Sequence, residues 1–276
     1  MMQLLDKPLP DLAAWTVHFA AASIPVAPQT VIDIAELRED EDSVNAHDIA
    51  PVILRDPLMT VKLFAHISSR KRTLQLTEIE SVSGCIIMMG VPPFFRTFSN
   101  LAPYTAHLQN NLTAQNGLQQ VFDRAVRAAG YALGWAVRRQ DLDAEAITIA
   151  TLLHDIAEML LWCHAPKLAM QIGELQKMKP GLRSSVAQRA LLGIDLNDLE
   201  RALFLRWNLP SLLLRMVDDK LFENPQLRNV RYAVDLARHS AIGWDNAALP
   251  DDYRHIGDLV HLPAEEVRRL VDPNCA

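Results

Sequence analysis

Apolar side chains three and four positions apart run through long stretches of this chain. Between Leu118 and Ala136 this spacing places them along one face of an α-helix, and a shorter segment from Val31 to Leu37 repeats it. No stretch shows a convincing alternation of apolar and polar residues, which a half-buried strand would require. Glycine is scarce, with 10 in 276 residues, as is typical of helices. The sequence therefore predicts an all-α fold.

Composition and charge restrict the classes of function. Half of the residues are hydrophobic and 22% are charged, which is the balance of a soluble globular protein. The net charge of -6 gives no basic field for nucleic acid or anionic lipid. Apolar runs such as residues 85–91 are too short to span a bilayer, and the three cysteines are widely spaced. We expect a cytoplasmic protein with neither nucleic-acid nor membrane partners.

Local signals place several helix ends. At Asp56-Pro57 the aspartate suits an N-cap and the proline suits the first helical turn. Residues 77–80 (TEIE) have the pattern of a capping box that opens a helix, which Gly90 would close. Trp207 and Pro210 are expected to mark another helix end that packs into the bundle, because tryptophan is rarely exposed and the residue before proline disfavours the α conformation.

One polar stretch suggests a boundary within the chain. Three asparagines and two glutamines gather between Pro103 and Gly117, as in a loop or linker. We predict an N-terminal helical subdomain at residues 1–105, a polar connection at 106–116 and a second helical bundle at 117–276.

One short pattern with possible catalytic meaning is present, the dipeptide His-Asp, which occurs twice. The chain has no glycine-rich phosphate loop, no Gly-x-Ser-x-Gly and no His-Glu-x-x-His. His47-Asp48 follows Ser43 and Asn45, both suitable N-caps, so it is expected in the exposed first turn of a helix.

The second dipeptide, His154-Asp155, requires a different explanation. It lies in the middle of the run 146–157 (AITIATLLHDIA), whose apolar residues cover nearly every side of a helix, so the helix is expected to be buried. A buried carboxylate without a partner is costly, so these side chains must be paired, hydrogen-bonded or bound to metal.

Five short motifs in order resemble the HDOD family, the divergent and largely non-catalytic relatives of the HD phosphohydrolases of bacterial signalling. Each is weak alone, but their order along roughly residues 20 to 245 makes the resemblance specific. They are residues 24–28 (IPVAP), 55–60 (RDPLMT), 86–90 (IIMMG), 152–156 (LLHDI) and 206–210 (RWNLP). The resemblance implies that the second half is an HD-like helical bundle.

The resemblance also implies which residues would bind metal. HD hydrolases use a His from an earlier helix, the His-Asp pair and a distant Asp, with further His residues for a second ion. Here the earlier His is replaced by Ala125, and a later His is replaced by Leu196. A usual His-His pair appears as Asp218-Asp219, and the candidate for the distant Asp is Asp235.

The ligands that remain are therefore His154, Asp155 and Asp235, with Asp218 and Asp219 as auxiliaries. Such a set is incomplete for zinc or iron of the His-rich type. One His with carboxylates would suit a weak Mg or Mn site. Three interpretations stay open. We favour a relict site, in which these side chains satisfy the hydrogen-bonding needs of the buried polar groups around them. The other two are a weak metal site and an active hydrolase.

The favoured function is a non-catalytic signal-transduction module that acts through protein–protein interaction and has no cofactor. The alternative is a metal-dependent phosphohydrolase that acts on a nucleotide or phosphoester. No second domain is recognised in the sequence, so a signalling partner is expected to act in trans. Neither that partner nor the oligomeric state can be named from the sequence.

Overall fold

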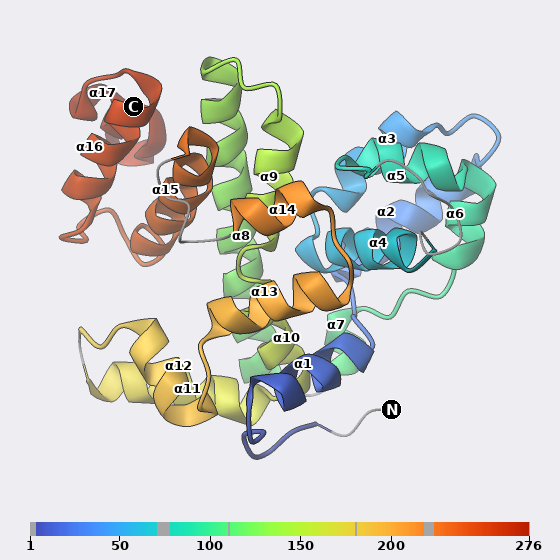
Figure 1. Ribbon diagram of the computed structural model, residues 1–276, viewed down its shortest axis with the longest axis horizontal. Helices are drawn as coiled ribbons and strands as arrows, with labels where there is room; N and C mark the ends of the chain where they lie inside the picture. The colour runs from blue at the N-terminus through green and yellow to red at the C-terminus, as the bar shows by residue number, and fades with distance from the viewer. Residues whose placement is uncertain (1–3, 71–77, 110, 180, 218–223, 276) are drawn as a thin grey trace. The chain divides into compact units, whose positions relative to one another are not determined.

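The computed structural model describes residues 4–70, 78–109, 111–179, 181–217 and 224–275, and within these ranges the regular structure is helical (Figure 1). This confirms the predicted all-α class. The helices, in chain order, are α1 (Leu12–Ala21), α2 (Pro28–Glu39), α3 (Ala46–Ile53), α4 (Pro57–Arg70), α5 (Val82–Met89), α6 (Val91–Thr97), α7 (Tyr104–His107), α8 (Leu112–Arg138), α9 (Ala144–Leu153), α10 (Ile156–His164), α11 (Pro166–Met178), α12 (Ser184–Leu192), α13 (Leu196–Arg206), α14 (Ser211–Met216), α15 (Pro225–His239), α16 (Leu249–Val260), α17 (Ala264–Val271) and the 3-10 turn η3 (Pro273–Cys275).

The chain forms two compact units. Unit 1 contains residues 1–122 and 155–210, and unit 2 contains residues 123–154 and 211–276. This partition differs from the predicted boundaries at 105 and 117. The long helix α8 already begins inside the predicted polar connection, and α10 to α13 return to pack with the N-terminal helices.

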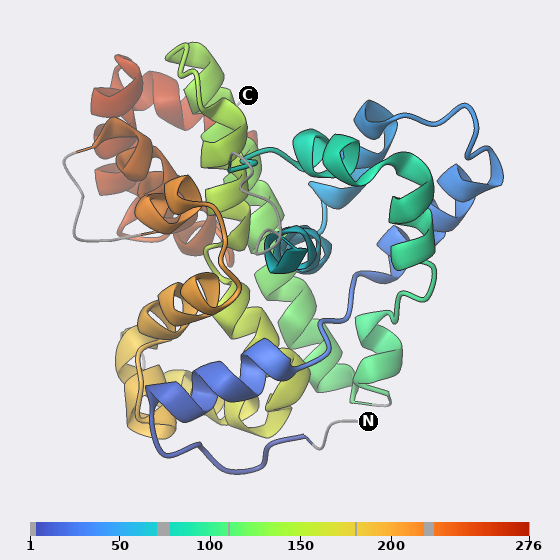
Figure 2. The same ribbon diagram turned by 45° about the vertical axis from the view of Figure 1, so that its right-hand side comes forward.

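In unit 1, helix α1 lies beside α13 (Figures 1 and 2). The buried face of α1 carries Trp15 and Phe19, which pack edge to face at a ring-centroid distance of 5.3 Å. The indole N–H of Trp15 also donates to the carbonyl of Leu192, at a long 3.4 Å. Aromatic burial of this kind explains why α1 joins helices that follow it by more than a hundred residues.

The Asp-Pro signal marks a helix start, as predicted. Asp56 caps α4, accepting a hydrogen bond from the Met59 N–H at 2.9 Å, and Pro57 occupies the first helical position. The other carboxylate oxygen accepts from the Ala27 N–H and the Thr30 hydroxyl, at 2.7 and 2.8 Å. The fully buried carboxylate therefore holds the start of α2 against the start of α4.

The start predicted for the next helix is wrong, whereas its end is correct. Helix α5 begins at Val82, and its N-cap is Ser81, whose hydroxyl accepts from the Gly84 N–H. Thr77, the cap expected from the sequence, lies outside the described residues. Gly90 ends the helix with φ 80°, in the left-handed region that glycine tolerates best.

Two other predicted ends are confirmed. Asn45 caps α3 in a capping box with Asp48, and His47 is exposed in the first turn. Helix α13 ends at Arg206, followed by a buried Trp207 and by Asn208 with φ 53°.

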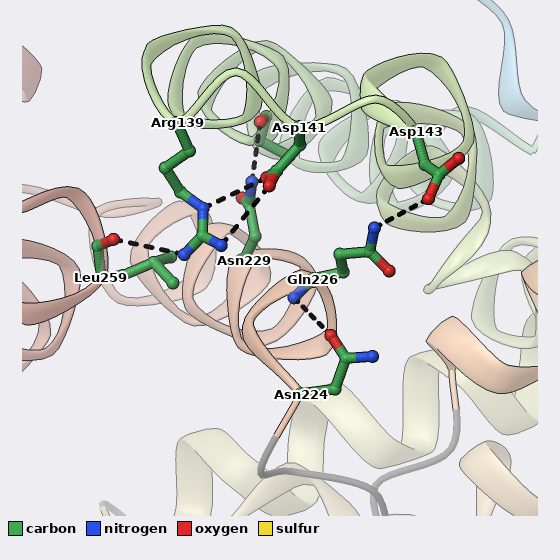
Figure 3. Close-up of polar contacts among 8 residues, drawn as sticks. Arg139, Asp141, Asp143, Asn224, Gln226, Asn229 and Leu259 are labelled. Atoms are coloured by element: carbon green, nitrogen blue, oxygen red, sulfur yellow. Dashed lines mark hydrogen bonds and ion pairs between the residues drawn. The ribbon is translucent and has the colours of Figure 1, made fainter.

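In unit 2, polar contacts join α8 and the residues just after it to helices α15 and α16. Figure 3 shows Arg139 donating to the Leu259 carbonyl at 3.2 Å and pairing with Asp141 at 3.1 Å. The buried Asn229 amide donates to the Ala132 carbonyl at 3.1 Å. Gln226 donates to Asp143, which connects α15 to the start of α9.

Among the described residues, one stretch is long and apolar enough to cross a membrane. It is Ala144–His164, and 89% of its most apolar window is buried within the protein. Burial of this extent is typical of segments in a protein core.

Candidate functional site

His154 and Asp155 lie at a helix junction. The sequence placed them in the middle of one buried helix, but α9 ends at Leu153 and α10 begins at Ile156. His154 is the C-cap of α9, and Asp155 is the N-cap of α10. Both are buried, with 8% exposure each, as predicted. The division between the two units also falls at this junction, with His154 in unit 2 and Asp155 in unit 1.

Asp235, the third predicted ligand, lies on α15 and is paired with a cation. Its carboxylate accepts from the Arg231 guanidinium at 3.0 Å, one helical turn earlier. The guanidinium neutralises part of the charge that a metal ion would use. Asp218 and Asp219, the predicted auxiliaries, lie outside the described residues.

The two positions where the resemblance expects histidine are occupied by buried hydrocarbon. Ala125 on α8 is 3% exposed, and Leu196 at the start of α13 is 5% exposed. Within the described residues, no three His, Cys, Asp or Glu side chains form a group that could hold a metal ion. The predicted set of His154, Asp155 and Asp235 draws on both units, and it stays a prediction.

A cluster of histidines in unit 1 was missed by the sequence reasoning. His107 and His164 lie edge to face with ring centroids 5.0 Å apart, and Phe19 lies 5.9 Å from His164. The rings of His18 and Phe19 are also 5.9 Å apart, measured between their centroids. No short motif links the three histidines, because their positions are far apart in the sequence. The only signal in the sequence is that His164 ends an apolar helix.

Burial favours the neutral form of two histidines in this cluster, His164 and His18. Burial, followed by the neighbouring His107 and His18, lowers the pKa of His164 to about 3. Burial also lowers the pKa of His18. The Nε2 atom of His107 lies 3.0 Å from the Cys163 carbonyl oxygen. Burial raises the pKa of the Cys163 thiol, so this cysteine is an unreactive core residue.

Unit 2 contains a histidine with the opposite electrostatic environment. The Nδ1 atom of His239, at the end of α15, lies 2.7 Å from an Asp252 carboxylate oxygen on α16. The hydrogen bond with Asp252 raises the pKa of His239, against the opposing effect of burial. This pair connects α15 to α16. Its histidine is protonated at neutral pH more readily than an isolated histidine.

Comparison with solved structures shows the same fold in bacterial proteins. The MmoQ response regulator from Methylococcus capsulatus str. Bath superposes with a TM-score of 0.66 at 20% identity, over 91% of this chain and 99% of the other. A virulence factor from Campylobacter jejuni subsp. jejuni gives 0.69 at 15% identity, over 96% and 97%. An HDOD domain protein of unknown function from Geobacter sulfurreducens gives 0.50 at 16% identity, over 95% and 93%.

No curated protein sequence matches the chain. Comparison with protein families, in contrast, gives a match to the HDOD domain over residues 24–220, a range that contains all five motifs named above. Because this match covers well over half of the sequence, the chain belongs to the HDOD domain family.

Proposed function

We propose that this protein is a non-catalytic signal-transduction module that works by binding another protein. The observation that carries the proposal is the pair of buried hydrocarbon side chains, Ala125 and Leu196, at positions where a hydrolase of the wider HD group would have histidine. A methyl or isobutyl group cannot coordinate a metal ion. It also offers no hydrogen-bond donor to a substrate phosphate.

The charges around the remaining candidate ligands support this proposal. Asp235 is engaged by Arg231. Hydrolysis of a phosphoester needs a cation held firmly enough to acidify water and to orient the phosphate. Carboxylates without such a cation repel an anionic substrate. Family membership supports a signalling role, and one protein of similar fold is described as a response regulator.

The first experiment tests for hydrolysis. The purified full chain is assayed with p-nitrophenyl phosphate, its bis-ester and a nucleotide panel, with added Mg²⁺, Mn²⁺ or Ni²⁺. We expect no turnover above that of the Asp155→Asn variant, and no stoichiometric transition metal after chelation and repurification. Turnover that Asp155→Asn abolishes, or metal near one equivalent, would instead support the alternative of a metal-dependent phosphohydrolase.

The second experiment tests for a partner. Crosslinking in the native cell, followed by mass spectrometry of the captured protein, should recover a signalling protein that acts in trans. Reconstitution with that purified protein should then change its activity or its oligomeric state. A partner that binds without any such change would contradict the regulatory role.

A further inference from the structure

A groove lies between α2 and α6 in unit 1. On α2 its lining residues are three and four positions apart, so they form one face of the helix. The opposite wall comes from the end of α6 and the segment after it. The cavity has a volume of about 240 Å³ and is lined by Val31, Ile34, Ala35, Arg38, Glu39, Phe95, Phe98, Ser99 and Leu101.

The floor of the groove is apolar and fixed by packing. Ile34, Phe95 and Phe98 are each less than 5% exposed. One end is tied by backbone hydrogen bonds, in which the Val26 N–H donates to Ala102 at 3.0 Å and the Tyr104 N–H donates to Val26 at 2.8 Å. These bonds join the segment before α2 to the segment after α6. The two walls are therefore held in place before anything binds.

The size of the groove favours a side chain over a cofactor. Pockets for small organic ligands usually enclose roughly 300–1,000 Å³. A cavity of about 240 Å³ is smaller than these, but it accommodates apolar side chains of a bound segment. Recognition of one helix face by an apolar groove is a common mode of peptide binding.

The charges beside the groove select the kind of partner. An acidic run covers the end of helix α2 and the residues just after it. It contains one basic residue, Arg38, and its acidic residues are Glu36, Glu39, Asp40, Glu41 and Asp42. All but Glu41, which is half-buried, are exposed. The carboxyl end of a helix adds negative potential to these carboxylates. The combined charge attracts cations and disfavours an acidic peptide or a nucleic acid.

We propose that the groove between α2 and α6 docks a basic amphipathic segment of a partner protein. An apolar side chain of that segment enters between Ile34, Phe95 and Phe98, and its lysine or arginine residues lie beside Glu39 and the acidic run. This inference rests on the proposed function, because it names the partner surface that a binding module would use.

The experiment uses the full chain and a short synthetic helical peptide with leucine on one face and lysine on the other. Two matched peptides carry glutamate in place of lysine, or serine in place of leucine. Binding is measured by fluorescence anisotropy at two salt concentrations. We expect the leucine–lysine peptide to bind, more weakly at high salt, and the two matched peptides to bind at least about tenfold more weakly.

Variants then locate the binding site. Ala35 is an exposed lining residue, so Ala35→Trp fills the groove from its rim without disturbing the core. It should weaken peptide binding about tenfold, whereas Ala13→Trp, an exposed change on α1, should not. Glu39→Lys should weaken binding about two- to fivefold, and Glu266→Lys, exposed on α17, should leave it unchanged. Circular dichroism checks that all variants fold.

Three results would overturn the inference: no binding of the leucine–lysine peptide, equal binding of the glutamate peptide, or equal effects of Ala35→Trp and Ala13→Trp. None of these results bears on the proposed function, since a partner could dock elsewhere on the protein. Phosphoester turnover would refute the proposed function whatever the peptide does, so the two failures are distinguishable.

Discussion

At the scale of single residues, Asp56 shows how a family motif serves the fold. Its carboxylate is fully buried and accepts from the Ala27 and Met59 N–H groups and from the Thr30 hydroxyl. Burial raises the pKa of Asp56, and these hydrogen bonds oppose the rise. The sequence predicted the N-cap from Asp-Pro alone. It could not predict the contacts with Ala27 and Thr30, because those depend on how α2 packs.

Removal of this carboxylate should therefore lower the stability of the fold more than removal of an ordinary N-cap. Asp56→Ala leaves three buried donors without their acceptor, and we expect it to lower the free energy of unfolding by roughly 2–4 kcal/mol. The matched control is Asp11→Ala, which removes an exposed N-cap with one bond to the Ala14 N–H and should cost about 1 kcal/mol. Urea denaturation measures both. Equal losses would show that the contacts with α2 add nothing.

Trp207 is the second residue whose burial can be tested directly. It caps the end of α13 and is 8% exposed. Trp207→Ala should lower the free energy of unfolding by roughly 3–5 kcal/mol, as expected for a buried aromatic side chain. An unchanged thermal midpoint would contradict this packing.

At the scale of elements, two glycines of helix α8 have different surroundings. A Cβ on Gly117 of α8 would lie 2.4 Å from the indole of Trp162 on α10, whereas nothing lies within 4 Å of one on Gly134. Both helical segments around Gly117 and Trp162 belong to unit 1. The first glycine therefore permits a close approach of two helices, which no local pattern in the sequence indicates.

Substitution of these two glycines by alanine should change the stability in opposite directions. Gly117→Ala should lower the free energy of unfolding by about 1–3 kcal/mol, because the methyl group overpacks the contact with Trp162. Gly134→Ala should raise it by about 0.5–1 kcal/mol, because alanine favours the helix and meets no neighbour. Thermal denaturation of both variants checks the pair. Stabilisation by Gly117→Ala would show that α8 and α10 are not in close contact there.

At the scale of the whole molecule, the helical class and several helix ends followed from the sequence, because they depend on local spacing and capping. The histidine cluster and the partition into units depend on packing between distant segments, and the sequence carried no sign of them. The same holds for the candidate site. Burial of His154 and Asp155 was predicted from the apolar run, but the helix break between Leu153 and Ile156 was not.

The two units should respond to pH with opposite signs, because each contains a histidine with a shifted pKa. In unit 1 the folded pKa of His164 is about 3, below the unfolded value of about 6.5. Between these values the unfolded state binds more protons, so stability falls as the pH falls, by about 2 kcal/mol from pH 7 to pH 5. In unit 2 the pKa of His239 is raised. The stability that His239 contributes is fully present below the pKa of the unfolded state, and it is lost as the pH rises through the pKa of the folded state.

Hydrogen exchange with mass spectrometry resolves the units separately. Once rates are corrected for the intrinsic effect of pH, acidification from pH 7 to pH 5 should reduce protection in α1 and α10, and should leave that of α15 and α16 unchanged or increased. His164→Phe fills the same apolar site without a titrating group, so it should remove the part of the acid response of unit 1 that comes from His164. His239→Gln should abolish only the response of unit 2. If His164→Phe left the loss of protection in α1 unchanged, the acid sensitivity would have to come from groups other than His164.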